Sequence, residues 1–329
     1  MIKTLNIRLI SPAMIGGAQP RKLDPSHVLR PPSLRGMLRF WTRALAMGAG
    51  LNPAEEESKL WGSIDRGQGI SLLPPSKFVQ TASLRVLRKS PSHKEFSSDM
   101  FLPAASNIRL AFRLRGIDSA NLDKFRAVIW TWLHLGTVGR RSRRGYGSFI
   151  WEPTTGDLLD GYDPLNPAVD LTNPVALEDY LRRGLKRVYA AWSAPSATAS
   201  RTTYPAFTLA SIDQIFVGQP FTHNGQVLTH IADPVGEIRH IMHGLYTGAS
   251  GPREELGHAG RAPWLPIPKD PPRQASPVLW RLFPLTSGGF VPVMTWSPLT
   301  VTSIPSSTQV YRYLTGKLGF SNSLAGNPL

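Results

Sequence analysis

The first 151 residues alternate between two apolar periodicities, in an order that few folds admit. Strand-like patterns lie at 5–9, 70–73, 78–88, 108–114 and 149–151. Helical spacing, with apolar side chains every three or four residues, lies at 34–45, 53–60 and 122–133. The order strand, helix, strands, helix, strand predicts an α+β fold of the ferredoxin-like (RRM-like) kind, an antiparallel sheet covered by helices.

The first long helix is predicted to be strongly amphipathic. Ser33, after the stop at Arg30-Pro31-Pro32, is its expected N-cap, since a serine oxygen accepts hydrogen bonds from free amides of the first turn. Its buried face is expected to hold Leu34, Leu38, Trp41 and Leu45. A neighbouring face carries what we call the arginine stripe, Arg35, Arg39 and Arg43. Asn121 is the expected N-cap of the later helix.

Residues 139–148 form an unusual segment, the arginine–glycine loop. Its order is Gly139, Arg140, Arg141, Ser142, Arg143, Arg144, Gly145, Tyr146, Gly147 and Ser148. Glycine permits positive φ and close backbone approach to a ligand, successive amides can form an anion nest, and arginine makes bidentate phosphate contacts. Tyr146 is placed to stack on an exposed base. The loop contains no Walker or dinucleotide-binding motif, so it predicts polyanion binding and not a nucleotide cradle.

The net charge of +15 is confined to the first half of the chain. Residues 1–150 contain 24 basic and 9 acidic side chains, whereas residues 151–329 contain 13 of each. A one-sided basic field favours nucleic acid, because neutralised phosphates release counterions. The alternative to nucleic-acid binding, for both the stripe and the loop, is a charged surface that contacts only solvent.

The second half predicts another sandwich of similar type. We expect domains at 1–155 and 173–329 joined by a Pro/Gly/Asp-rich linker at 156–172. Asn173 is the expected N-cap of a helix with one face of Leu177, Leu181, Leu185, Val188 and Trp192. Strands are expected at about 205–217, 276–284 and 290–297, and helices at about 234–246 and 306–318. A Pro/Gly-rich insertion lies near 247–273.

Other chemistry is weakly represented. The chain has no cysteine, no apolar run long enough to span a membrane and no signal-peptide pattern at its start, so we expect a cytoplasmic protein without disulfides. Five of the eight histidines lie at 223–258, and His240 and His243 have helical spacing, but no carboxylate completes a metal site. We therefore expect no metal, no cofactor and no small-molecule substrate.

These motifs together resemble the RAMP proteins of CRISPR-Cas effectors, and within that family the first-numbered Cmr subunit of the type III-B complex. The resemblance rests on the early strand with Gly16-Gly17, the segment Arg30 to Trp41, the run 57–60 before Trp61-Gly62-Ser63, the arginine–glycine loop, and Arg273-Gln274-Ala275-Ser276-Pro277. It covers most of both halves. Trp61 stands where an aromatic such as Phe is common, and the resemblance does not account for 247–273, whose role stays open.

The resemblance implies two ferredoxin-like domains and a place near the 3′ end of the guide (CRISPR) RNA, beside other RAMP subunits. There the chain helps to bind guide RNA and to capture target RNA, while target cleavage and cyclic oligoadenylate synthesis belong to other subunits. We therefore predict a non-catalytic RNA clamp formed by Gly16, Gly17, Arg30, Ser33, Arg35, Gly36, Arg39, Arg43, Arg140, Arg141, Arg143, Arg144, Gly145, Tyr146 and Gly147.

Two other functions stay open at this level. One is a metal-independent endoribonuclease of the RAMP superfamily that processes guide RNA, with His27 as general base on a 2′-hydroxyl. The other is a ribosome or assembly protein with a basic face.

Overall fold

The computed structural model describes most of the first half of the chain and selected parts of the second. The described residues are 1–15, 29–65, 67–74, 82–89, 94–139, 145–162, 165–192, 208–209, 215–218, 220, 222–223, 226–227 and 278–296. All structural statements below concern these residues.

The first sheet has the strand order β2-β5-β1-β6, and every neighbouring pair is antiparallel. Its strands are β1 (Ile2–Leu9), β2 (Ile70–Leu73), β5 (Asn107–Leu114) and β6 (Phe149–Glu152). Helices α1 (Pro31–Gly48) and α3 (Ser119–Leu135) connect β1 to β2 and β5 to β6. The order strand, helix, two strands, helix, strand with this sheet order is the ferredoxin-like sandwich expected from the sequence.

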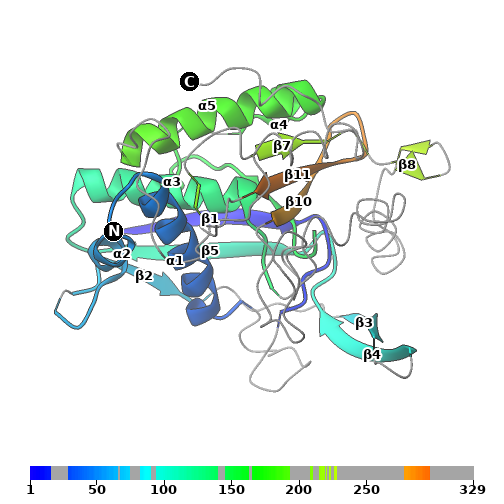
Figure 1. Cartoon of the computed structure of the whole chain (residues 1–329), viewed down its shortest axis with the longest axis horizontal. Helices are drawn as coiled ribbons and strands as arrows, with labels where there is room; N and C mark the ends of the chain where they lie inside the picture. The colour runs from blue at the N-terminus through cyan, green and yellow to red at the C-terminus, as the bar shows by residue number, and fades with distance from the viewer. Residues whose placement is uncertain are drawn as a thin grey trace, which may run out of the picture.

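Two elements are added to that sandwich. Helix α2 (Pro53–Trp61) packs beside α1, and Asn52 caps it by accepting from the amides of Ala54 and Glu55. Between β2 and β5 the strands β3 (Ala82–Lys89) and β4 (Lys94–Phe101) pair along their whole length as a hairpin that projects from the body (Figure 1). The sequence predicted one strand at 78–88; the second strand, β4, was not predicted.

Two predicted helix caps are wrong by a few residues. Helix α1 begins at Pro31 with Arg30 at the N-cap, and no side chain caps it. Proline suits the first turn because its missing N–H has no partner there in any case. Helix α3 begins at Ser119, and the Asp118 carboxylate accepts from the Asn121 amide at 2.7 Å. The aspartate three residues earlier therefore takes the capping role that we expected of Asn121.

The second sheet contains three antiparallel strands in the order β10-β11-β7. They are β7 (Ile215–Val217), β10 (Val278–Pro284) and β11 (Phe290–Trp296), with a small separate pair β8 (Thr222–His223) and β9 (Gln226–Val227). Helix α5 (Pro174–Trp192) is capped by Asn173, as predicted, and its predicted apolar face is buried. Two antiparallel sheets with helices agree with the expected α+β class. The helices expected at 234–246 and 306–318 lie outside the described residues.

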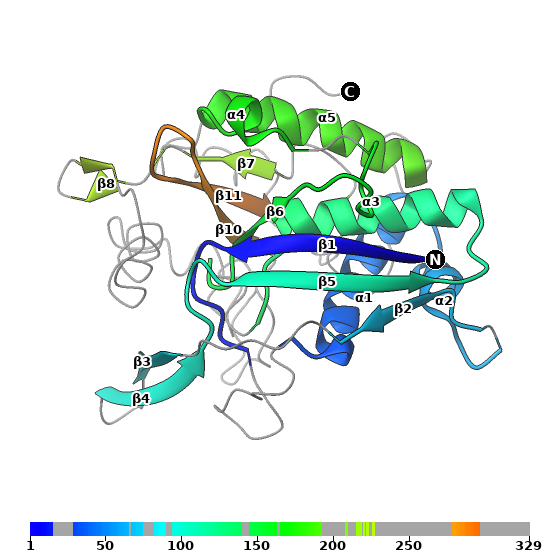
Figure 2. The same cartoon turned by 180° about the vertical axis from the view of Figure 1, so that it is seen from behind.

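Helix α3 lies between the first sheet and α5, an arrangement that both views show (Figures 1 and 2). At the crossing of the two helices, a Cβ on Gly184 would lie 1.8 Å from the Trp130 ring, so only glycine permits this approach. Arg281 of β10 is also buried in this seam, which we call the α3–α5–β10 seam. One continuous hydrophobic core therefore joins the two sheets.

The segment predicted as a linker, 156–172, is part of that core at its described residues. Leu158 and Leu159 are fully buried, and Leu165 and Leu171 nearly so. The Asp157 carboxylate accepts from the Trp151 indole at 3.1 Å and from the Leu159 amide at 2.7 Å. The segment also includes the short helix α4 (Pro167–Asp170). The Asp, Pro and Gly residues here form turns in a packed segment.

Candidate nucleic-acid interface

Helix α1 turns its apolar face inward and its arginine stripe outward. Leu34, Leu38, Trp41 and Leu45 are 0–3% exposed, which confirms the predicted core face and the core assignment of Trp41. The side chains of Arg39 and Arg43 are 45% and 47% exposed. The amphipathic spacing thus places the stripe on the surface of the first domain, as expected.

A single carboxylate from α2 holds two members of the stripe. Arg39 Nε donates to Glu57 Oε1 at 2.5 Å, and Arg43 Nη1 donates to Oε2 at 2.8 Å. The Glu57 side chain is only 10% exposed, so the two guanidinium groups are oriented against a nearly buried anion. Sequence reasoning missed Glu57, because the contact depends on how α2 folds back on α1.

Arg35 differs from the other two arginines of the stripe. Among the described residues it forms no ion pair and no side-chain hydrogen bond, so its charge is not neutralised locally. One turn earlier, the Nε of Arg30 is buried without a hydrogen-bond partner. Among the described residues, Arg35 is therefore the member of the stripe whose charge has no carboxylate partner, whereas Arg39 and Arg43 share one.

The glycines of the arginine–glycine loop have the positive φ values that the sequence predicted, at +86° for Gly139, +77° for Gly145 and +67° for Gly147. Their purpose differs from the expectation. A Cβ on Gly147 would lie 1.9 Å from the Val138 carbonyl oxygen, and one on Gly139 would lie 2.6 Å from that of Met14. The close approach is to the protein's own backbone.

Hydrogen bonds confirm that the end of this loop is structural. The Gly147 amide donates to the Pro12 carbonyl and its own carbonyl accepts from Val138, both at 2.9 Å. The Gly145 carbonyl accepts from the hydroxyls of Ser11 and Ser148, at 2.6 and 2.8 Å. The Gly147 amide is therefore not free for an anion nest, and the expectation that these two glycines approach a ligand is corrected: both are buried.

Tyr146 also requires a correction. It is 8% exposed and belongs to the hydrophobic core, so its ring is not presented to a base as predicted. A tyrosine between two buried glycines is drawn inward because the flanking backbone is fixed against Pro12 and Val138. The sequence pattern cannot distinguish this from an exposed stacking residue.

The rest of the predicted clamp lies outside the described residues. This concerns Gly16, Gly17, Arg140, Arg141, Arg143 and Arg144, as well as His27, His240, His243 and the segment 247–273. Their roles stay predictions.

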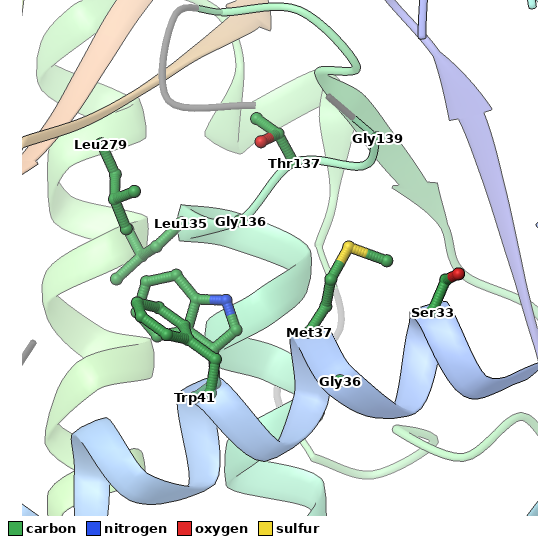
Figure 3. Close-up of a pocket in the computed structure, with 10 residues that line it drawn as sticks. Ser33, Gly36, Met37, Trp41, Leu135, Gly136, Thr137, Gly139 and Leu279 are labelled. Carbon is green, nitrogen blue, oxygen red and sulfur yellow. The ribbon is translucent and has the colours of Figure 1, made fainter. Parts of the chain in front are cut away.

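A pocket of about 310 Å³ lies between α1 and the segment that leads into the arginine–glycine loop. From α1 it is lined by Ser33, Gly36, Met37, Phe40 and Trp41. Across from them lie Leu135, Gly136, Thr137 and Gly139, together with Leu279 of β10 (Figure 3). The structure thus brings three predicted site features to one place: Ser33, Gly36 and the first residue of the loop.

The titratable groups of the α3–α5–β10 seam do not form a second site. Burial lowers the pKa of His134 to about 3, so its ring is neutral at neutral pH, and its two nitrogens contact the Trp130 carbonyl at 2.7 Å and the Tyr180 hydroxyl at 2.8 Å. Burial also lowers the pKa of Arg281, to about 9, which leaves it charged. Its guanidinium donates to the carbonyls of Leu133 and Phe149. Both groups have structural partners and no access to solvent.

Within the described part of the chain, no cluster of three or more His, Asp or Glu side chains could hold a metal ion. None of the helices described there is long and apolar enough to cross a membrane.

Comparison with known proteins gives a family match over part of the chain and a shared fold. Residues 6–150 match the model of the RAMP superfamily. No curated protein matches the chain. Apo Cmr1 from Pyrococcus furiosus is similar in structure, with a TM-score of 0.51 and 17% sequence identity over 93% of this chain and 91% of that one.

Cryo-EM structures of Type III-B Cmr-beta contain similar chains. In the complex bound to cognate target RNA, the TM-score is 0.60 at 10% identity, over 97% of this chain and 98% of that one. In the complex bound to cognate target RNA and AMPPnP, in the presence of ssDNA, the TM-score is 0.55 at 10% identity, over 97% and 99%. At these identities the likeness shows a shared fold, and it extends over nearly the whole of each chain.

Proposed function

We propose that the chain is an RNA-binding subunit of a type III-B CRISPR-Cas (Cmr) effector complex, because residues 6–150 match the model of the RAMP superfamily. In this role it binds guide RNA near the 3′ end and helps to capture target RNA, beside other Cmr subunits and in the cytoplasm. The fold supports the proposal. This chain is similar in fold to Cmr1 and to a chain of a Cmr complex bound to target RNA, and each similarity covers nearly the full length of both chains.

One observation carries the assignment of the interface. Ser33 and Gly36 of α1 line the same pocket as Gly139, the residue that directly precedes Arg140. Arg35, which has no ion pair among the described residues, lies between Ser33 and Gly36 in the sequence. Helix α1 therefore presents the arginine stripe on one face and a wall of the pocket on another, and the loop arginines follow directly after a residue that lines the pocket.

The chemistry of this surface suits the backbone of RNA. Guanidinium groups bind phosphates through paired N–H donors, and these contacts hold a nucleic acid without regard to its sequence. Arg39 and Arg43 share Glu57, so together they contribute one net positive charge, whereas Arg35 contributes a full one. We expect Arg35 and the loop arginines to carry most of the phosphate binding.

The salt dependence of RNA binding tests this proposal. Arg35→Ala should weaken binding of a labelled single-stranded guide RNA and reduce the slope of log affinity against log salt by about one. Replacing Arg140, Arg141, Arg143 and Arg144 together with alanine should reduce the slope further. The control is Lys186→Ala, which removes one exposed charge from α5 in the second half of the chain. Equal slopes for the wild type, Arg35→Ala and the loop variant would reject the interface.

We also propose that the chain does not itself cleave RNA. Among the described residues, His134 is buried and both its ring nitrogens have hydrogen-bond partners, so it is not placed to act as a base on RNA. Incubation of the purified protein with repeat RNA should leave the RNA intact. Metal-independent cleavage that disappears in His27→Ala would instead establish the endoribonuclease.

A further inference from the structure

The pocket beside α1 has a composition that phosphate binding does not explain. Its walls include Met37, Phe40 and Leu279, and the aromatic pair of Phe40 and Trp41 meets edge to face with ring centroids 5.3 Å apart. Polar side chains also line it, Ser33 from α1 and Thr137 from the opposite wall. Apolar walls with a few polar groups are typical of a site for a small, flat, partly polar molecule.

The size of the pocket limits what it can accept. At about 310 Å³ it lies near the lower end of the range of small-ligand pockets, about 300–1,000 Å³. That volume suits one ring system and excludes a segment of helix or strand. A nucleobase has both required properties, a π-face that packs on aromatic and sulfur-containing side chains and an edge that forms hydrogen bonds.

Two glycines on opposite walls leave the pocket without a side chain at these positions, for different reasons. On the loop side, a Cβ on Gly136 would lie 2.6 Å from Trp132 and 3.0 Å from the Trp41 indole nitrogen, so that position has no room for a side chain. On the helix side, a Cβ on Gly36 would meet no atom within 4 Å. Glycine weakens a helix interior relative to alanine, so Gly36 leaves space above α1 that the fold itself does not need.

We propose that this pocket receives one unpaired base of the bound RNA. This inference rests on the proposed function and adds to it a second kind of contact. The phosphate contact depends on charge, and the base contact depends on stacking and on the space above Gly36. Because few polar groups border the pocket, we expect it to accept any of the four bases.

Gly36→Leu tests the pocket without disturbing the arginines. The new side chain enters open space, so the thermal midpoint should match or exceed that of the wild type. The affinity for single-stranded RNA should fall about tenfold, as expected for loss of one stacked base. The salt slope should not change, because the phosphate contacts remain. Gly67→Leu is the matched control, since a Cβ at Gly67 also meets no atom within 4 Å and the residue does not line the pocket.

A second measurement separates the base from the backbone. RNA with abasic nucleotides keeps every phosphate, so the wild type should bind it about tenfold more weakly than intact RNA, and Gly36→Leu should bind both equally. If the wild type binds both RNAs equally, or if Gly36→Leu binds intact RNA as the wild type does, the base pocket is rejected. Loss of copurifying effector subunits without loss of RNA affinity would also reject it, in favour of a protein side chain.

The two proposals fail in distinguishable ways. An unchanged salt slope in Arg35→Ala rejects the phosphate interface, whereas an unchanged affinity in Gly36→Leu rejects the pocket and leaves the phosphate interface in place.

Discussion

Helices α1 and α5 each carry a glycine in their interior, and the two glycines lie in opposite environments. Gly36 on α1 has open space where a side chain would begin, whereas Gly184 on α5 touches the Trp130 ring. The arginines of the two regions differ in the same way. Arg35 is partly exposed and has no ion pair among the described residues, whereas Arg281 in the α3–α5–β10 seam is 1% exposed.

The contrast separates two uses of the same residue types. In the seam, Gly184 allows α5 to approach α3 closely, and the side chain of Arg281 fills buried space beside them. On α1 they leave a pocket open and a charge available. A count of glycines and arginines along the sequence treats the two regions alike, so variants that affect one region and spare the other provide the sharpest tests.

Arg281→Ala should have the largest effect on stability. The guanidinium donates to the carbonyls of Leu133 and Phe149 and lies 4.1 Å from the centroid of the Phe283 ring. Its removal leaves both buried carbonyls without this donor and creates a cavity, so we expect a loss of about 3–5 kcal/mol in the free energy of unfolding. Urea denaturation of Arg281→Ala beside Arg35→Ala measures the difference. Arg35→Ala should stay within about 0.5 kcal/mol of the wild type, and equal losses would contradict the contrast between the two arginines.

Gly184→Ala should follow in size. A methyl group 1.8 Å from the Trp130 ring forces α3 and α5 apart, which we expect to cost about 2–3 kcal/mol. Gly36→Ala should have the opposite sign and stabilise the protein by about 0.5–1 kcal/mol, because alanine is the better helix former. Thermal denaturation of both variants compares the two helices directly. A loss in Gly36→Ala would show that the space above α1 is not open.

The pH dependence of stability tests the seam alone. His134 has a folded-state pKa of about 3, lowered by burial and by the charge of Arg281 against the hydrogen bond to Trp130. Below the ordinary histidine pKa of about 6.5 the unfolded chain binds a proton that the folded chain does not, so stability falls as pH falls through this window. The expected contribution is up to about 1.4 kcal/mol per pH unit.

His134→Gln should remove that part of the slope between about pH 6 and pH 4, because glutamine does not titrate. Urea denaturation of the wild type and the variant at several pH values measures it. Tyr180→Phe is a useful comparison, since it removes the hydroxyl at 2.8 Å from the ring and keeps the titrating group. The interpretation fails if the slopes of the wild type and His134→Gln are the same.

The sequence predicted the fold better than the site. The strands at β1, β5, β10 and β11 and the apolar faces of α1 and α5 follow from periodicity, because burial of one face leaves a regular pattern in the chain. Capping residues were predicted less well, since Arg30 caps α1 only through its backbone and Asp118 competes with Asn121. The hairpin β3–β4 lies outside the main sandwich, and the ferredoxin-like order of strands and helices does not require it.

The misassigned site residues share a physical cause. A glycine at positive φ can approach a ligand or the protein's own backbone, and Gly147 does the second, which only the tertiary structure reveals. Burial of Tyr146 depends on the same contacts. Arg281 was not singled out, because arginine is rarely buried and a strand pattern gives no reason to expect it. Partners such as Glu57 depend on helix packing that no local pattern encodes.

Glu57→Gln should have a small effect on stability and sharpens the comparison from the side of α1. Glutamine keeps the shape of Glu57 but removes the charge that holds Arg39 and Arg43. Because both arginine side chains are nearly half exposed, we expect a loss of about 1 kcal/mol or less. The two guanidinium groups then gain one net positive charge, so RNA affinity at low salt should rise by about two- to threefold and the salt slope should steepen.

The matched control is Glu55→Gln on the same helix, which removes an exposed carboxylate paired with Lys59 at 2.8 Å and does not contact the stripe. Tighter binding in both variants would indicate only a general effect of net charge, whereas a change confined to Glu57→Gln would show that the arginine stripe itself contacts RNA.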